Sequence, residues 1–338
     1  MRKINVGIIG IGYLGKLHSK IIRDVENANL IGIYDLNFSA AEIVAKEFKT
    51  KVFHELEGLL KEVEAIIIVA STKAHYQLVK TALNFGVNVF VEKPITAEIW
   101  EAEEIVQLAE NKNLKLQVGH IERFNGALVS LEKYNLDPMF IQTDRLAQFN
   151  TRGADVAVVL DLMIHDIDII LSLVKSEVKH ISASGVNVVS DSLDIANARI
   201  EFENGAVANV TASRISQKKM RKMRIFQRDA YISIDFNSGI SEIFRLVAPD
   251  DKLLKDFISF GEMGIGEKKK AIIYEQPEQK EINALKYEQQ LFINAVANNS
   301  TPIVSGKDGL KALIVADMII KEIQKSKFLG KDEKNYEK

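Results

Sequence analysis

The sequence predicts an α/β protein, with a doubly wound parallel sheet at the N-terminus followed by an α+β domain that holds a large, mostly antiparallel open sheet. Residues 3–118 alternate short apolar runs with helical patterns, as βαβ units do, whereas the runs after residue 178 are long and rich in β-formers. A chain of 338 residues also suffices for two domains. We expect the first over 1–120, the second over 121–325, and a tail over 326–338, with the last helices able to pack back on the first domain.

The first domain is expected to contain parallel strands and the helices that connect them. Several of its apolar runs are continuous, as in strands that are covered on both faces. We place the strands at residues 4–9, 30–35, 65–70, 87–92 and 114–119, and the helices at 39–48, 74–85 and 97–112.

The second domain is expected to begin with a long apolar helix at 155–174. Asn204-Gly205 signals a tight hairpin turn between two β-rich runs. Residues 249–281 are charged and are expected to be irregular and exposed. The β-rich runs lie at 178–190, 193–215, 223–236 and 240–247, and helices near 283–298 and 308–325 close the chain.

The composition excludes several classes of function. The formal net charge is −2, which gives no electrostatic reason to bind nucleic acid or a membrane surface. The chain has no cysteine, so disulfides, thiolate metal sites, iron–sulfur clusters and a cysteine nucleophile are absent, and a cytoplasmic location is favoured. No apolar run approaches the roughly 20 residues that span a bilayer.

The first strand leads into the glycine loop GIGYLG and a helix that begins near Tyr13. In this context GxGxxG is typical of dinucleotide binding. Gly10 allows the tight turn, Gly12 lets the backbone approach a pyrophosphate, and Gly15 lets the helix pack on the strand. The pyrophosphate would lie at the helix N-terminus, beside Tyr13 and Leu14. The alternative is a glycine-rich turn without a ligand.

The second strand ends in Asp35, 20 residues after Gly15. An acid at this spacing accepts hydrogen bonds from the adenosine ribose hydroxyls, and it repels a 2′-phosphate. Leu36 and Asn37 supply no arginine for such a phosphate. We therefore predict an NAD-binding Rossmann domain, with NADP less favoured; the alternative is a surface aspartate.

Glu92-Lys93-Pro94 follows the fourth predicted strand of the parallel sheet. Ligands bind outside the carboxyl ends of such strands. Lys93 could therefore contact a substrate hydroxyl and the nicotinamide ribose together. The alternative, a salt-bridged Glu92–Lys93 pair, is equally compatible with the dipeptide alone.

These residues resemble the Gfo/Idh/MocA family of oxidoreductases, and the resemblance covers essentially the whole chain. It implies a Rossmann domain, an α+β domain whose open sheet often forms an oligomer interface, and hence a homodimer or homotetramer. It also implies reversible hydride transfer between a nicotinamide and a hydroxyl carbon, usually on a sugar or cyclitol. Residues that the resemblance adds to the cofactor site are Ser71, Thr72, His75, Glu92 and Lys93.

A polar stripe crosses the apolar helix expected at 155–174. Asp161, His165, Asp168 and Ser172 fall at i, i+4, i+7 and i+11, on one face, which should border a wet cleft. Oxidation of an alcohol needs a base for the hydroxyl proton, and a histidine can be neutral at working pH. We predict His165 as this base, Asp161 as its orienting partner or a hydroxyl ligand, and Lys93 as stabiliser of the alkoxide or as a relay for the proton.

Two other readings of this stripe stay open. His165 and Asp168 could form a buried ion pair, or Asp161, His165 and Asp168 could ligate a metal. We expect no metal, because hydride transfer needs no Lewis acid when a lysine is present.

Arginines flank the predicted site. Arg123 and Asn125 follow the last Rossmann strand, and Arg145 and Arg152 precede the apolar helix. Guanidinium groups pair with phosphate in a bidentate way, so these residues suit an anionic substrate, although most arginines are surface charges.

The stretches GHIERFN and LDLMIHDID resemble most the subgroup that oxidises the 3-hydroxyl of UDP-N-acetylhexosamines. The alternatives are an inositol or free-sugar dehydrogenase, which would not need the arginines, and a non-catalytic dinucleotide-binding regulator, which would not need a base. The expected partners are thus a sugar or nucleotide-sugar substrate and NAD.

Overall fold

The computed structural model describes residues 2–150 and 156–332. Its described residues divide into two compact units. The first unit comprises 2–124 and 283–314, and the second comprises 125–282 and 315–332. Each unit contains one sheet, parallel in the first and almost wholly antiparallel in the second, so the predicted fold class is confirmed.

The first unit is built on a six-stranded sheet in the order β3-β2-β1-β4-β5-β6, with every neighbouring pair parallel. The order reverses between β1 and β4, and ligands of open α/β sheets bind at the carboxyl ends beside such a switch point. The strands are β1 (Ile4–Ile9), β2 (Ala28–Tyr34), β3 (Lys51–Val52), β4 (Ala65–Ile68), β5 (Asn88–Glu92) and β6 (Leu116–Gly119).

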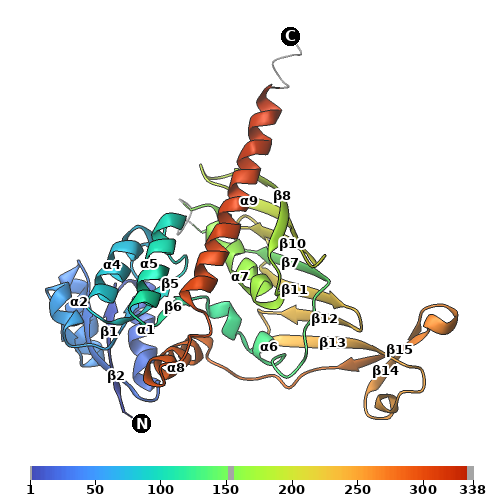
Figure 1. Cartoon of the computed structure of the whole chain (residues 1–338), viewed down its shortest axis with the longest axis horizontal. Helices are drawn as coiled ribbons and strands as arrows, with labels where there is room; N and C mark the ends of the chain where they lie inside the picture. The colour runs from blue at the N-terminus through green and yellow to red at the C-terminus, as the bar shows by residue number, and fades with distance from the viewer. Residues whose placement is uncertain (1, 151–155, 333–338) are drawn as a thin grey trace. The chain divides into compact units, whose positions relative to one another are not determined.

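Helices cover both faces of this sheet (Figure 1). Because the strands are buried from both sides, Ile8, Ile67 and Phe90 have no exposed surface. The helices are α1 (Tyr13–Ile21), η1 (Ile22–Asp24), α2 (Phe38–Phe48), α3 (Leu56–Leu60), α4 (Thr72–Asn84), α5 (Ile99–Asn111) and η2 (Ile121–Phe124). The short elements β3 and α3 were not expected from the sequence.

Helix α8 (Ala284–Ala297) belongs to the first unit although it lies far along the chain. Phe292 and Ile293 are fully buried in the same apolar cluster as Phe90. The following helix, α9 (Gly306–Asp332), starts in the first unit, continues in the second, and extends beyond the predicted end at residue 325.

The second unit is built on a nine-stranded sheet in the order β14-β15-β13-β12-β11-β7-β10-β9-β8. Only the β7–β10 pair is parallel. The strands are β7 (Phe140–Leu146), β8 (Val178–Val186), β9 (Ile195–Phe202), β10 (Val207–Ser213), β11 (Met220–Gln227), β12 (Ala230–Asp235), β13 (Ile240–Val247), β14 (Ile258–Met263) and β15 (Lys270–Glu275).

Two expectations for this unit have different outcomes. The Asn204-Gly205 hairpin is confirmed, because β9 and β10 pair antiparallel and Gly205 has a φ of +85°. The expectation that 249–281 is irregular was wrong, since it contains β14, β15 and the short helices η4 (Lys252–Lys255) and η5 (Gly266–Lys268). β14 is exposed along its whole length. Because it has no buried face, its sequence lacks the alternation of apolar and polar residues that marks a half-buried strand.

The remaining helices of the second unit are α6 (Gly126–Val129), the π-helical turn η3 (Val159–Met163) and α7 (Ile164–Leu173). The apolar helix expected at 155–174 is thus a π turn continued by an α-helix. Among the described residues, no helix is long and apolar enough to cross a membrane.

Candidate active site

The glycine loop at the carboxyl end of β1 has the geometry that its sequence demands. Gly10 has a φ of +88°, and a Cβ there would lie 2.5 Å from the carbonyl oxygen of Val69. A Cβ on Gly15 would lie 1.9 Å from the carbonyl oxygen of Gly10. A Cβ on Gly12, by contrast, would meet no atom within 4 Å. Open space therefore borders the N-terminus of α1 at Gly12, where an anion would meet its N–H groups.

Asp35 closes the glycine loop from the end of β2. Its two carboxylate oxygens accept hydrogen bonds from the backbone N–H groups of Ile11, at 2.6 Å, and Asn37, at 2.7 Å. A carboxylate has about four acceptor positions, so these two bonds leave capacity for ribose hydroxyls. Tyr13 and Leu14, in the first turn of α1, expose 72% and 42% of their surface. The loop, Asp35 and the first turn of α1 thus fit a dinucleotide.

The ends of β4 and β5 are joined by a buried histidine. His75 lies on α4 just after Ser71 and Thr72, and its Nδ1 and Nε2 lie 2.9 Å and 3.1 Å from the carbonyl oxygens of Pro94 and Ala70. Burial lowers the pKa of His75, although these carbonyls and Glu92 act in the opposite direction. Both ring nitrogens therefore contact backbone carbonyls, whereas Ser71, the residue before α4, is exposed.

Glu92 is the last residue of β5, Lys93 follows the strand, and the Lys93-Pro94 peptide is cis. The Glu92 carboxylate lies 2.9 Å from Nε2 of His18, a residue of α1 that is 1% exposed. Burial alone would raise the pKa of Glu92, but the hydrogen bond from His18 and the charge of Lys93 hold it below its usual value. Lys93 is half-buried. Sequence reasoning missed His18, although it lies on the buried face of α1 with Gly15 and Ser19.

The residues expected to bind an anionic substrate have diverse surroundings. Arg123 lies 3.9 Å from Asp308, and 11% of its side chain is exposed. Asn125 caps α6 by accepting a hydrogen bond from Ala127 N–H, and its amide donates to the carbonyl of Phe236. Arg152 lies outside the described residues.

Asp161 and His165 lie on the less buried side of the π turn and α7. Both are half-buried, whereas Asp168 is 1% exposed, so the expected stripe does not continue through Asp168. In an α-helix, four residues rotate by about 400°, so the side chains of residues 161 and 165 would point about 40° apart. A π turn rotates less per residue, so it brings Asp161 and His165 closer to the same direction.

A buried ion pair fixes α7 to the sheet. Arg145 points inward from β7, and its Nε and Nη2 donate to Oδ2 and Oδ1 of Asp166 at 2.7 Å and 2.9 Å. Both side chains are 3% exposed. The guanidinium thus binds Asp166 in a bidentate way, whereas the sequence predicted that it binds the substrate. Alternation of Ile141, Thr143 and Arg145 along β7 is the sequence signal for this inward position.

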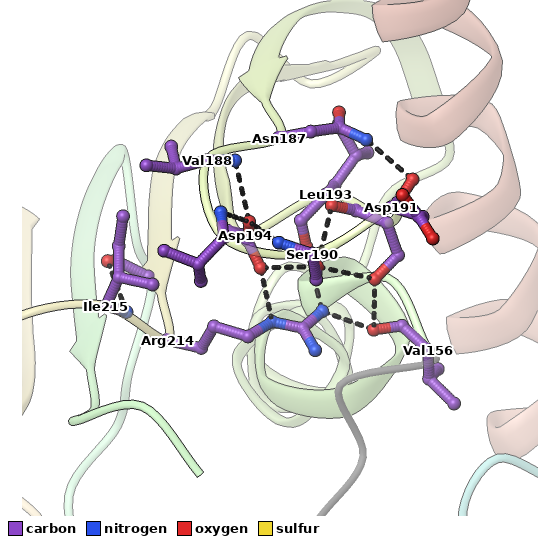
Figure 2. A network of polar contacts seen from close by, with 12 residues as sticks. Val156, Asn187, Val188, Ser190, Asp191, Leu193, Asp194, Arg214 and Ile215 are labelled. Atoms are coloured by element: carbon purple, nitrogen blue, oxygen red, sulfur yellow. Dashed lines mark hydrogen bonds and ion pairs between the residues drawn. The ribbon is translucent and has the colours of Figure 1, made fainter. Parts of the chain in front are cut away.

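A second polar network holds the chain where it enters the π turn (Figure 2). Arg214, at the end of β10, donates to the carbonyl oxygens of Val156 and Leu193, and its Nε lies 3.5 Å from Asp194. Asp194 in turn accepts from the backbone N–H groups of residues 188–190 and from the Ser190 hydroxyl. Burial alone would raise the pKa of Asp194, but these hydrogen bonds lower it to about 2. Sequence reasoning missed this network.

Within the described part of the chain, no group of three or more histidine, aspartate or glutamate side chains could hold a metal ion. Asp161, His165 and Asp168, the metal ligands considered from the sequence, do not form such a group.

Comparisons with known proteins cover both units. Residues 4–120 match the oxidoreductase family with an NAD-binding Rossmann fold named GFO/IDH/MocA, and residues 125–233 match the GFO/IDH/MocA C-terminal domain. The chain is 36% identical to UDP-N-acetylglucosamine 3-dehydrogenase of Acidithiobacillus ferrooxidans over 72% of this chain and 78% of that protein.

A solved structure of UDP-N-acetylglucosamine 3-dehydrogenase from A. ferrooxidans superposes with a TM-score of 0.85 at 31% identity, and covers 96% of this chain and 98% of its own. The chain is also 28% identical to scyllo-inositol 2-dehydrogenase (NAD(+)) of Bacillus subtilis, over 63% of this chain and 68% of that protein.

Proposed function

The chain belongs to the Gfo/Idh/MocA family of oxidoreductases, and on this premise we propose that it is an NAD-dependent dehydrogenase that oxidises the 3-hydroxyl of a UDP-N-acetylhexosamine. The observation that carries the choice of substrate is the likeness to UDP-N-acetylglucosamine 3-dehydrogenase, which extends over 96% of the chain in structure.

The cofactor half of the proposal rests on the glycine loop and Asp35. The open space at Gly12 accommodates a pyrophosphate, and the free acceptor capacity of Asp35 suits the two ribose hydroxyls of NAD. A 2′-phosphate would bring a second negative charge to the same carboxylate, so NAD is preferred to NADP. When bound, the nicotinamide supplies the hydride acceptor.

The catalytic half rests on His165, Asp161 and Lys93. His165 takes the proton of the substrate hydroxyl, because imidazole is the side chain whose usual pKa suits a base near neutral pH. Asp161, one turn earlier, orients the imidazole or binds a neighbouring hydroxyl. The Lys93 ammonium stabilises the negative charge that develops on the substrate oxygen. The supporting observation is that Asp161 and His165 are half-buried, whereas Asp166 and Asp168 on the same helix are buried.

The arginines give this proposal less support than the sequence suggested. Arg145 is committed to Asp166, and Asn125 caps a helix, so we leave both out of the proposed substrate site. Arg123 stays in it as a ligand for a substrate phosphate, together with Arg152.

The alternative substrate is an inositol or a free sugar, and the similarity to scyllo-inositol 2-dehydrogenase supports this alternative. The non-catalytic alternative, a dinucleotide-binding regulator, would bind NAD without turnover of any alcohol. A substrate panel separates the three.

We further propose that the protein forms homo-oligomers through the sheet of the second unit. A ladder of aromatic rings in successive contact crosses this sheet from β7 to β14; it comprises Phe140, Phe226, Tyr231, Phe244, Phe260 and Tyr274. Phe140 alternates with the inward Arg145, so the ladder lies on the face opposite α7. Sedimentation of the wild type and of Phe244→Glu tests this: a monomeric wild type contradicts it.

The test of function is absorbance at the NADH band with purified protein, NAD, and a panel of UDP-sugars, free sugars and inositols. We expect reduction of NAD with UDP-N-acetylglucosamine, lost by about 10²- to 10⁴-fold in His165→Ala. His180→Ala is the matched control, because His180 is an exposed histidine of the same unit.

Turnover of free polyols alone would replace the substrate and keep the mechanism. NAD binding without turnover of any member of the panel, after clearance of cofactor that co-purifies in reduced form, would favour the regulator.

A further inference from the structure

Three polar side chains from three elements of the first unit, two of them buried and the third half-buried, form a series of hydrogen bonds that ends beside Lys93. Gln289 of α8 lies with its Nε2 2.9 Å from Nδ1 of His18, and Nε2 of His18 lies 2.9 Å from the Glu92 carboxylate. Gln289 has no exposed surface and His18 is 1% exposed. The contacts bring together residues 271 positions apart in the sequence.

The direction of these hydrogen bonds is fixed by chemistry. An amide nitrogen can only donate, so Nδ1 of His18 accepts, and Nε2 then carries the proton that is donated to Glu92. The Gln289 nitrogen also lies 3.4 Å from the carbonyl oxygen of His18. The reverse orientation of the amide would place two oxygens there, which would repel each other. In this arrangement Nδ1 of His18 accepts from Gln289, and Nε2 donates to the Glu92 carboxylate.

Packing prevents the hydrogen-bonded side chains from rearranging. The His18 ring lies edge-on to Phe90 at 5.6 Å, and Phe90 contacts Phe292 of α8 at 5.8 Å. On the other side, a Cβ on Gly119 would lie 2.9 Å from the carboxyl carbon of Glu92, so β6 passes directly against this group. Glu92 is thus confined between His18 and the backbone of β6.

We propose that His18 and Gln289 are positioning residues, which hold the Glu92 carboxylate in place and thereby set the position and charge environment of Lys93. The proposal rests on the function proposed above, in which Lys93 stabilises the developing alkoxide. Glu92 and Lys93 are adjacent in sequence, so a shift of the carboxylate moves the end of β5 and the ammonium with it. A geometric error of about 1 Å at a reacting group can cost about 100-fold in rate.

The attachment of α8 to the first unit does not require the hydrogen bonds between Gln289, His18 and Glu92. Phe292 and Ile293 already bury the helix in the core. The neighbouring Gln290 exchanges hydrogen bonds with the backbone of Glu26, at 2.8 Å and 3.1 Å. Gln290 therefore docks α8 without contact to His18, and it serves as a matched control for Gln289.

The experiment compares Gln289→Leu, His18→Leu and His18→Gln with Gln290→Leu, in the full chain. We expect kcat to fall about 10- to 100-fold in His18→Leu, in proportion to a hydrogen bond to a charged group. Gln289→Leu should lose about tenfold, and His18→Gln should recover part of the loss because its amide can still donate. NAD affinity should stay within about twofold, and Gln290→Leu should match the wild type.

Equal effects of Gln289→Leu and Gln290→Leu, or losses confined to NAD affinity, would overturn the proposal. A second measurement does not depend on turnover: ¹⁵N NMR of the histidine rings should show His18 protonated at Nε2 and bare at Nδ1. Protonation at Nδ1 would overturn the proposal. Because this measurement needs no substrate, it can be made even if the protein oxidises no alcohol and the proposed function fails.

Discussion

Arg145 donates hydrogen bonds of 2.7 Å and 2.9 Å to the two carboxylate oxygens of Asp166, the residue that follows His165. The bond joins β7, in the middle of the antiparallel sheet, to the helix α7. A bidentate pair constrains both distance and orientation, so it fixes the rotation of α7 about its axis. The direction in which His165 leaves the helix is therefore determined by a pair of residues that need not touch substrate.

We predict that breaking this pair from either side strongly destabilises the protein. Arg145→Met or Asp166→Leu leaves the other charge buried without its partner, and such changes cost about 3–5 kcal/mol. The double variant removes both charges and should be more stable than either single variant. Urea unfolding, followed by circular dichroism, measures the free energy of unfolding for all three.

The pair Lys222–Asp235, at 3.4 Å, is the control, because Lys222 is exposed and Asp235 is only half-buried. Lys222→Met should change the free energy of unfolding by about 1 kcal/mol or less, because surface ion pairs contribute little. If Arg145→Met were as mild as Lys222→Met, the pair would not anchor α7.

The pH dependence of stability should carry a contribution from Asp194. Hydrogen bonds lower its pKa from 3.8 to about 2 in the folded state, so the unfolded chain binds the proton more readily. The contribution is therefore present above pH 4, and is lost as the pH falls through about 2. Asp194→Asn lacks it at every pH.

Thermal unfolding of wild type and Asp194→Asn at a series of pH values measures this contribution. The difference in melting temperature should be constant from pH 7 to about 5 and shrink below about pH 4. All other carboxylates titrate in both proteins, so they cancel in the comparison. A difference that does not change with pH would mean that the Asp194 charge is unimportant for the network.

The elements that the sequence predicted well are those whose signal is local. The glycine loop, the parallel strands and the Asn204-Gly205 hairpin each depend on a few adjacent residues, and all occur near the predicted positions. The π turn at Val159–Met163 was not predictable in this way. Apolar periodicity marks a helix, but the choice of i→i+5 hydrogen bonds depends on what packs around it.

The parts of the site that were missed depend on pairing over long distances. Arg145 was interpreted as a substrate ligand because it precedes the apolar helix and guanidinium groups pair with phosphate, whereas its partner Asp166 lies 21 residues away on another element. His18 and Gln289 are 271 residues apart, and no local pattern around either residue indicates that the two are in contact. Buried polar residues need hydrogen-bond partners, and which residues are buried together depends on the fold.

We predict that Asp35 determines the choice of cofactor. Asp35→Ser removes the negative charge that opposes a 2′-phosphate and one acceptor for the ribose. We expect kcat/KM with NAD to fall about 10- to 100-fold, because the lost hydrogen bond is to a charged group, while use of NADP improves. Initial rates with both cofactors measure the change. If NAD and NADP were affected alike, Asp35 would only support the loop through Ile11.

Alanine at Gly12 and at Gly15 should have opposite effects on folding and binding. At Gly15 a Cβ would lie 1.9 Å from the Gly10 carbonyl oxygen, so Gly15→Ala must displace α1 or the loop and lower the melting temperature. At Gly12 the Cβ meets nothing within 4 Å and the φ of −65° suits alanine, so Gly12→Ala should fold as stably as the wild type.

The same methyl group on Gly12 would occupy the space that the pyrophosphate needs, and NAD affinity should fall at least about tenfold. Calorimetric titration with NAD, beside thermal unfolding without it, separates the two effects. A stable Gly12→Ala variant that binds NAD with unchanged affinity would place the pyrophosphate elsewhere, and it would remove the structural basis for the cofactor site proposed here.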